Sequence, residues 1–266
     1  MEINLIITDV TRMQKQRVCI GAISEDWDSI RPVLPYPGIL EAFLYTGDKQ
    51  VIRPFSRITL DLIKPIIDPP HTEDWEFTKK VLDYRGLLKE NHKTRFLKKI
   101  LDPSVDSIFG TEVYQLNSSC YVEYGTGKRS LGTIKVKSIE NVQLTNKNGN
   151  LGYRISFLDQ IGKLFNLSVT DLSFRYYVKN LIGKQNGDFS IISKKIEEKL
   201  QKADTYLRIG LGRAWSPPES NIKPHCYMFI TGVYSFPDYL EGKSFADFSY
   251  NKTSDGLFDE AEIRFG

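Results

Sequence analysis

The chain has few of the residues that build metal centres and disulfide frameworks. Its 266 residues include three cysteines and three histidines. Cys19, Cys120 and Cys226 lie about a hundred residues apart, so no pair has the short spacing of a zinc site, and their odd number argues against a disulfide framework. The histidines are equally scattered. We therefore expect no structural metal and no cofactor, and we expect the cysteines to act as small buried hydrophobic residues.

Long apolar runs are also missing. No segment approaches the ~20 consecutive apolar residues that a membrane-spanning helix requires. The first residues, "MEINLIITDV", have no basic stretch ahead of a long apolar run, which is unlike a signal peptide. We expect a cytoplasmic protein without a membrane partner.

Neither sign of charge is in large excess. The 36 basic and 33 acidic residues leave a net charge of +3, which permits an anionic partner but does not demand one. Apolar residues make up 41% of the chain and charged residues 26%, which is ordinary for a globular protein with a buried core.

Short runs of β-branched and aromatic residues, separated by turn residues, predict strands along most of the chain. The turns "NKNGN" and "DQIG" each supply a glycine for positive φ. We expect strands at 3–10, 17–24, 29–35, 56–65, 120–125, 132–144, 152–159, 163–171, 205–212 and 226–236.

Helical spacing of apolar residues predicts three helical segments, at 73–101, 172–183 and 190–202. Many short strands with a helical insertion in each half are typical of small closed barrels. The fold class we expect is therefore mainly β with helical insertions (α+β), arranged as two tandem OB-like barrels. The first would cover 1–115 with its insertion at 73–101, the second 116–240, and a polar, acidic tail 241–266.

The stretch "DPPHTEDW" at 68–75 permits two interpretations. His71, Glu73 and Asp74 are residue types of a metal or acid–base site. They also fit the start of a helix, in which Thr72 is the N-cap and the acids face the positive end of the helix dipole. The sequence favours the helix start.

Arg31 precedes Pro32, which restricts it to an extended conformation. Its guanidinium could bind a phosphate through its planar fork, or it could pair with an acid such as Glu73. The sequence leaves both readings open.

A basic segment, "YGTGKRSLGTIKVK" at 124–137, is the part most like a nucleic-acid-binding surface. Basic groups interleaved with aromatic rings form the grooves that bind single strands. The alternative is an ordinary hairpin with a solvated lysine face. The candidate residues here are Tyr121, Tyr124, Lys128, Arg129, Lys135 and Lys137.

A second candidate is "LRIGLGRAW" at 207–215. Gly210 and Gly212 allow a ligand or another backbone to come close, and Arg213 beside Trp215 provides a stacking platform. The alternative is that Trp215 fills the core.

With these segments in place, the chain resembles the dual OB-fold domain family, which occurs in bacterial proteins. The resemblance covers most of 1–235 and follows "RVCIGAI", "IRPV", "PPHTEDW", "LFNLSVTD", "LRIGLGRAW" and "CYMFITGVY" in order. It departs at Asp74, where an amide is expected, and at Arg213. The positions it selects are Arg17, Arg31, Pro32, Thr72, Glu73, Trp75, Ser168, Thr170, Asp171, Gly210 and Gly212.

The resemblance implies two OB barrels that bind nucleic acid or a nucleotide-like ligand, and it does not by itself imply an enzyme. Two other functions stay open. One is an enzyme acting on nucleic acid or nucleotides through Glu73, Asp74 and Asp171. The other is an interaction module, with a protein partner or a second copy of the chain, that uses the acidic tail.

Overall fold

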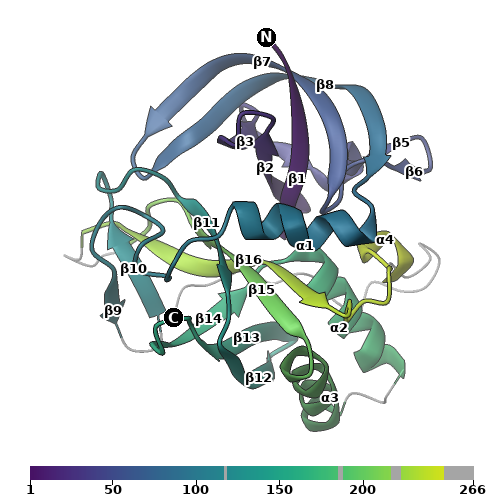
Figure 1. Cartoon of the computed structure of the whole chain (residues 1–266), viewed down its shortest axis with the longest axis vertical. Helices are drawn as coiled ribbons and strands as arrows, with labels where there is room; N and C mark the ends of the chain where they lie inside the picture. Colours follow the sequence, from purple (N-terminus) through teal and green to yellow (C-terminus); the bar gives the residue numbers. More distant parts are fainter. Residues whose placement is uncertain (117–118, 185–187, 217–222, 249–266) are drawn as a thin grey trace.

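Five strands of the N-terminal half close into a barrel in the computed structural model, which describes residues 1–116, 119–184, 188–216 and 223–248 (Figure 1). The strands pair in the order β1-β7-β8-β3-β2 and return to β1. Only β3 and β8 run parallel within this ring. The barrel strands are β1 (Glu2–Arg12), β2 (Arg17–Ser24), β3 (Ser29–Val33), β7 (Ser56–Asp68) and β8 (His71–Leu87).

The connection from β3 to β7 is made of short elements. They are β4 (Ile39–Leu40), the 3-10 helix η1 (Glu41–Leu44), β5 (Tyr45–Thr46) and β6 (Lys49–Gln50). Of these, β4 pairs with β2, and β5 and β6 form a separate two-stranded ribbon.

The C-terminal half repeats the same order in a curled, incompletely closed sheet. Its strands follow β11-β15-β16-β14-β13-β12, and β14 and β16 form its parallel pair, as β3 and β8 do in the first barrel. The strands are β11 (Leu131–Lys135), β12 (Ser138–Lys147), β13 (Asn150–Leu158), β14 (Leu164–Val169), β15 (Asp204–Leu211) and β16 (His225–Phe236).

The strands β11 and β12 act as two halves of one bent strand. The predicted strand 132–144 is interrupted at Val136 and Lys137, whose N–H groups donate to Thr205 (3.0 Å) and Leu158 (2.8 Å) on different neighbouring segments. One half therefore pairs with β15 and the other with β13. Two short strands, β9 (Tyr114–Leu116) and β10 (Ser119–Glu123), extend the sheet from β16.

The helix predicted over 73–101 is wrong for most of its length. Residues 71–87 form β8, and only α1 (Glu90–Lys99) is helical. Trp75 and Phe77 are spaced by two residues and face the first core, and hydrogen bonding to both β7 and β3 overrides the helix-like composition. Thr72 is consequently a strand residue and not an N-cap.

Other local predictions are confirmed. The helices α2 (Leu172–Lys184) and α3 (Phe189–Gln201) connect β14 to β15 close to the expected ranges. In the "NKNGN" turn, Asn148 and Gly149 have φ of 54° and 85°, the left-handed pair that a two-residue hairpin turn requires.

Each sheet encloses its own apolar core, and a third cluster lies between them. Phe96 and Leu97 of α1 pack in this third cluster with Phe55 from the first barrel and Tyr206 and Tyr234 from the second. The helix α1 therefore lies across the junction of the two barrels (Figure 1).

A buried ion pair joins the barrels next to this cluster. Arg208 of β15 is 1% exposed, and its Nε donates to Asp9 Oδ1 at 3.0 Å. The same guanidinium donates through Nη1 to Thr133 Oγ1 at 2.8 Å. Gly21 lies opposite Asp9, and a Cβ there would stand 2.5 Å from the carboxylate, so this position has no room for a side chain.

The C-terminal segment begins with contacts to both cores. The short helix α4 (Phe245–Phe248) buries Phe245 in the first core and Phe248 in the second. Residues 249–266, where the acidic part of the predicted tail falls, lie outside the described residues. The division at 115/116 falls within β9 and stays a prediction.

No helix in the described ranges is long and apolar enough to cross a membrane. The expected cytoplasmic location stays a prediction.

The buried pair gives a stability prediction. Arg208→Met leaves the Asp9 carboxylate buried without a cation, and we expect the free energy of unfolding in urea to fall by about 3–5 kcal/mol. Adding Asp9→Asn should recover part of the loss. The control Lys202→Met changes an exposed lysine on the same half of the chain and should stay within about 0.5 kcal/mol of wild type. A loss below about 1 kcal/mol for Arg208→Met, the range of surface pairs, would contradict this role.

Candidate nucleic-acid interface

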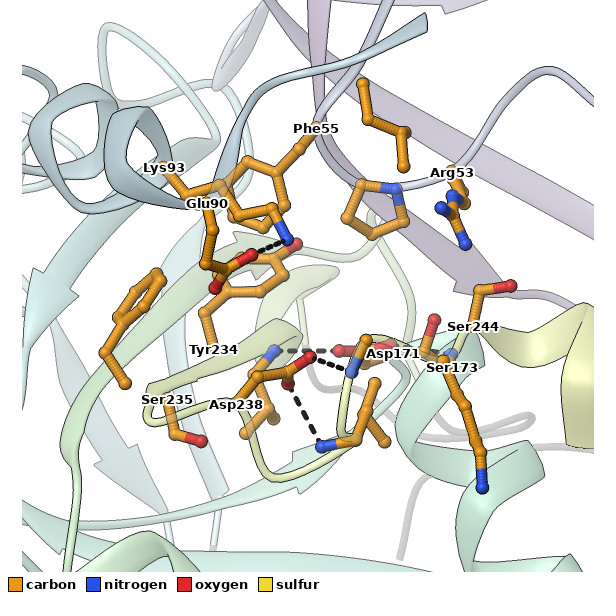
Figure 2. A pocket seen from close by; sticks show the side chains of 17 residues that line it. Arg53, Phe55, Glu90, Lys93, Asp171, Ser173, Tyr234, Ser235, Asp238 and Ser244 are labelled. Carbon is orange, nitrogen blue, oxygen red and sulfur yellow. Dashed lines mark hydrogen bonds and ion pairs between the residues drawn. The ribbon is translucent and has the colours of Figure 1, made fainter.

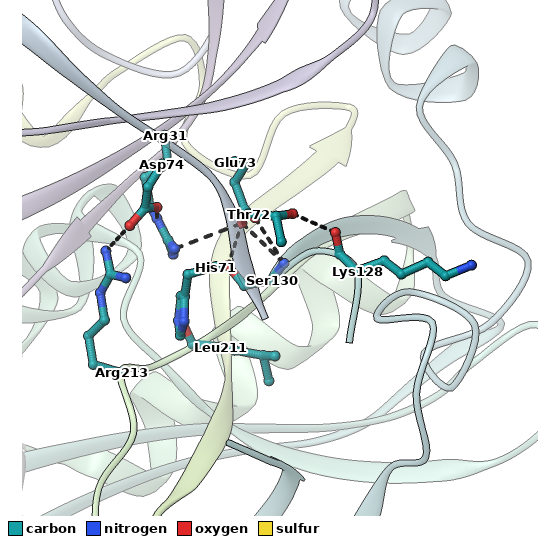
Figure 3. A network of polar contacts seen from close by, with 9 residues as sticks. All are labelled: Arg31, His71, Thr72, Glu73, Asp74, Lys128, Ser130, Leu211 and Arg213. Carbon is teal, nitrogen blue, oxygen red and sulfur yellow. Dashed lines mark hydrogen bonds and ion pairs between the residues drawn. The ribbon is translucent and has the colours of Figure 1, made fainter. Parts of the chain in front are cut away.

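OB barrels bind ligands on the outer face of their second and third strands and on the loops between strands one and two and between strands four and five. In the first barrel, the second barrel covers much of this face. Arg31 points outward from β3 yet is 3% exposed, and its Nε donates to Asp74 Oδ1 at 2.5 Å. The other Asp74 oxygen accepts from Arg213 of the second barrel (Figure 3). Arg31 is thus enclosed in the inter-barrel contact, and its main partner is Asp74, since Glu73 is 3.9 Å away.

The "DPPHTEDW" stretch is the tight turn between β7 and β8, and it docks on the second barrel. The Pro69 carbonyl accepts from the Gly125 N–H at 3.1 Å. The Thr72 hydroxyl donates to the Lys128 carbonyl at 2.5 Å. The Tyr124 hydroxyl donates to Asp68 at 2.9 Å. The loop between strands four and five of the first barrel is therefore part of the inter-barrel contact.

Glu73 and His71 are both committed to this contact. The Glu73 carboxylate accepts from the Ser130 backbone N–H at 3.1 Å and from the Ser130 hydroxyl. The Nε2 atom of His71 lies 3.3 Å from the Leu211 carbonyl (Figure 3). Burial, together with the nearby Arg31 and Arg213, lowers the pKa of His71 to about 3. The imidazole is accordingly neutral at physiological pH.

The three carboxylates considered for catalysis do not meet. Asp171 lies at the start of α2, where its carboxylate accepts from three backbone N–H groups at 2.7–3.2 Å. Among the described residues, no hydrogen bond or ion pair connects it with Glu73 or Asp74. In this same part of the chain, no group of three or more His, Cys, Asp or Glu side chains is placed to hold a metal ion. The absence of a structural metal stays a prediction.

The thiols are poorly suited to nucleophilic chemistry. Burial raises the pKa of Cys226 to about 11, and burial also raises the pKa values of Cys19 and Cys120. Cys226 is fully buried in the second core, whereas its neighbour His225 faces the outside of the sheet. The two side chains therefore do not form a dyad.

An aromatic surface lies on the outer side of β9, β10 and the start of β16. The Tyr121 ring is stacked on His225 (centroids 4.0 Å apart, 25° between planes) and on Tyr114 (5.5 Å, 23°). Tyr227 contacts Tyr121 at 5.9 Å and Trp215 at 6.0 Å. We call these five residues the aromatic face; four of them are partly exposed, and Tyr227 is buried. Trp215 is held by a two-way backbone bridge to His225.

The aromatic face includes two predicted residues and three that the sequence did not reveal. Tyr121 and Trp215 were candidates, and Tyr114, His225 and Tyr227 were missed. The spacing of His225 and Tyr227, two residues apart along β16, is visible in "HCYMF". Nothing in the local sequence indicates that β10 pairs with this part of β16. The pairing of Tyr121 with Tyr227 is what assembles the set.

The predicted basic residues are dispersed. Lys128 is exposed in the loop after Tyr124 and forms no ion pair in the described chain. Arg129 donates to Asp102 and to the Ile108 carbonyl. Lys135 pairs with Asp204 at 2.6 Å, and Lys137, which is exposed, follows at the bend between β11 and β12.

The remaining candidates have local structural roles. Arg17, at the start of β2, donates to the Gln14 carbonyl at 3.0 Å. Trp75 is half-buried against the first core. A Cβ on Gly210 would meet Thr231 at 2.7 Å, and one on Gly212 would meet Phe229 at 2.9 Å. The glycines thus admit neighbouring side chains of β16.

Comparison with known families gives one match. Residues 3–233 match the sequence model of a family described as the dual OB-containing domain. A search of curated proteins gave no match to the chain.

The buried neutral His71 predicts a specific acid sensitivity. In the unfolded chain His71 binds a proton below pH 6.5, whereas in the folded chain it does so only near pH 3. The stability that the neutral His71 contributes is therefore complete above pH 6.5 and is lost as the pH falls toward 3. The wild type should lose up to about 2 kcal/mol between pH 6.5 and 5 from this residue. His71→Gln should lack that loss in urea unfolding, whereas His92→Gln, at an exposed helix position, should retain it. Parallel curves for His71→Gln and wild type would refute the buried neutral imidazole.

Proposed function

The chain belongs to the dual OB-containing domain family, and from this premise we propose that its second barrel binds single-stranded nucleic acid or a nucleotide-like ligand. The proposal rests chiefly on the aromatic face, because stacked rings on the outside of an OB barrel are the usual platform for unpaired bases.

The geometry of the stack supports this function. His225, Tyr121 and Tyr114 form a column across three adjacent strands. Tyr114, on the edge strand β9, ends the column and is half-exposed, and its hydroxyl is fixed by Glu112 at 2.8 Å. A base placed on the outer side of the Tyr114 ring would continue the column.

The location of the aromatic face also supports the proposal. Trp215 follows β15 and His225 begins β16, which correspond to strands four and five of the second barrel. The loop between these strands is a common ligand-binding element of OB barrels. The corresponding loop of the first barrel contacts the second barrel, which favours a ligand site on the second barrel.

Two exposed lysines stand close to residues of the aromatic face along the chain. Lys128 follows Tyr121 in the β10–β11 loop, and Lys223 stands two residues before His225. Both are exposed, and neither forms an ion pair within the described ranges. Because their ammonium groups are solvated and unpaired, they can neutralise phosphates without breaking a protein contact.

Removing one ring of the column should weaken binding without sequence preference. We expect Tyr114→Leu and Tyr121→Leu each to lose about 1–3 kcal/mol of affinity for a labelled single-stranded oligonucleotide, measured by fluorescence anisotropy. The losses should be similar for pyrimidine and purine strands, because a ring face does not read base edges.

A matched control is Tyr36→Leu, which removes a tyrosine that is 88% exposed on the first barrel and should leave affinity unchanged. Thermal melts of all variants verify folding. If folded Tyr114→Leu and Tyr121→Leu bind as the wild type does, the aromatic face is not the nucleic-acid site.

Lys128 and Lys223 should control how the affinity for a single strand depends on salt concentration. Replacing Lys128 and Lys223 with alanine removes two phosphate contacts, so the slope of log K against log salt should decrease by about 1.4 in magnitude for a single strand. Lys194→Ala with Lys202→Ala removes the same charge from exposed positions on and just after α3 and should leave the slope unchanged. Equal slopes for the wild type and the Lys128/Lys223 variant would exclude these two contacts.

A further inference from the structure

A small pocket lies between the barrels, away from the aromatic face. Its volume is about 90 Å³. The first barrel contributes the segment around Arg53 and Phe55, α1 contributes Glu90 and Lys93, and the second barrel contributes the start of α2 and residues 233–244 (Figure 2).

The carboxylates that line this pocket are already saturated. Asp171 accepts three backbone N–H groups. Asp238 accepts two backbone N–H groups of its own loop, at 3.0 and 2.8 Å. Glu90 pairs with Lys93 at 2.6 Å. Glu90 is thus paired with a cation, whereas the oxygens of Asp171 and Asp238 are satisfied by backbone N–H groups.

Two cations and one hydroxyl at the pocket have no such partner. Arg53 is half-buried and Lys243 is exposed, and neither side chain forms a hydrogen bond or an ion pair with any described residue. Ser173 is 5% exposed, and its hydroxyl likewise donates to no described group. Arg53 and Ser173 lie on the same side of the pocket in Figure 2.

From these unpartnered groups we infer that the pocket binds a phosphate-sized oxyanion, held by Arg53 and Lys243 with a hydrogen bond from Ser173. The planar guanidinium provides paired N–H donors that fit two oxygens of a tetrahedral anion. The small volume admits a single phosphate group, either as the free ion or as the terminal group of a larger molecule that extends into solvent.

Asp171 does not oppose this charge strongly. Burial is the main cause that raises its pKa to about 7, so close to neutral pH part of the population carries an uncharged carboxyl group. The same residue caps α2, whose N-terminal end carries a partial positive charge.

Calorimetric titration of the full chain with inorganic phosphate tests the inference. We expect saturable binding at millimolar concentration, weakened about tenfold or more in Arg53→Gln and in Lys243→Gln. Both side chains lack protein partners, so both variants should melt as the wild type does. Arg57→Gln and Lys202→Gln, which remove the same charges elsewhere, should bind phosphate unchanged.

Nuclear magnetic resonance locates the site independently. Phosphate should shift the backbone amide signals of Ser173 and Gly242 in the wild type and not in Arg53→Gln. A nucleoside 5′-monophosphate that binds more tightly than phosphate, while the unphosphorylated nucleoside does not bind, would indicate a terminal phosphate group, and equal affinities would indicate the free ion. Absence of saturable binding, or equal weakening by the two control variants, overturns the inference.

Discussion

The arrangement of the two barrels depends on the burial of Arg208 against Asp9. Transferring both charges out of water costs several kcal/mol per ion, which is offset only when the pair is well aligned and its remaining polar atoms are bonded. Several features contribute to this condition: the register shift of β1 at Ile7/Asp9, the absence of a side chain at Gly21, and the hydroxyls of Thr8 and Thr133. Only Nη2 of the Arg208 guanidinium is buried without a hydrogen-bond partner among the described residues. A rotation of one barrel against the other would leave a charge buried without its partner. The ion pair thus restricts the barrels to one relative orientation.

In this orientation the two barrels, which have the same strand order, use their outward side chains differently. In the first barrel, outward side chains of β3 and β8 form the inter-barrel contact. Arg31 and Asp74 face each other in register, and Asp74 also accepts a hydrogen bond from Arg213 of the second barrel. In the second, β9 and β10 widen the sheet beside β16, and their tyrosines Tyr114 and Tyr121 form part of the aromatic face. In the proposed function, the first barrel therefore acts as a support and the second binds the ligand.

The sequence predicts the elements whose signals are local and misses those that depend on distant partners. Runs of β-branched and aromatic residues predict β2, β13 and β16, and an Asn-Gly pair predicts the turn between β12 and β13. The sequence does not predict β8 for two reasons. Its pairing with β7 has five register irregularities, which interrupt the alternation of inward and outward side chains. In addition, a proline turn before acidic residues is typical of a helix start. The aromatic face shows the same limit. Tyr121 and Trp215 stand out in their own segments, but the column needs β10 to pair with β16, about a hundred residues later, and no local pattern encodes that contact.

The strand β16 connects the two proposed ligand sites and also separates them. Its first residues carry His225 and Tyr227, and its last residues, Val233 to Phe236, line the pocket between the barrels. At about 3.3 Å per residue, Tyr227 and Tyr234 lie roughly 23 Å apart along the strand. Side chains separated by more than about 10 Å without shared partners affect binding and stability nearly additively. We therefore expect a phosphate in the pocket and a base on the aromatic face to bind independently of each other, so that a substitution at one proposed site leaves binding at the other unchanged.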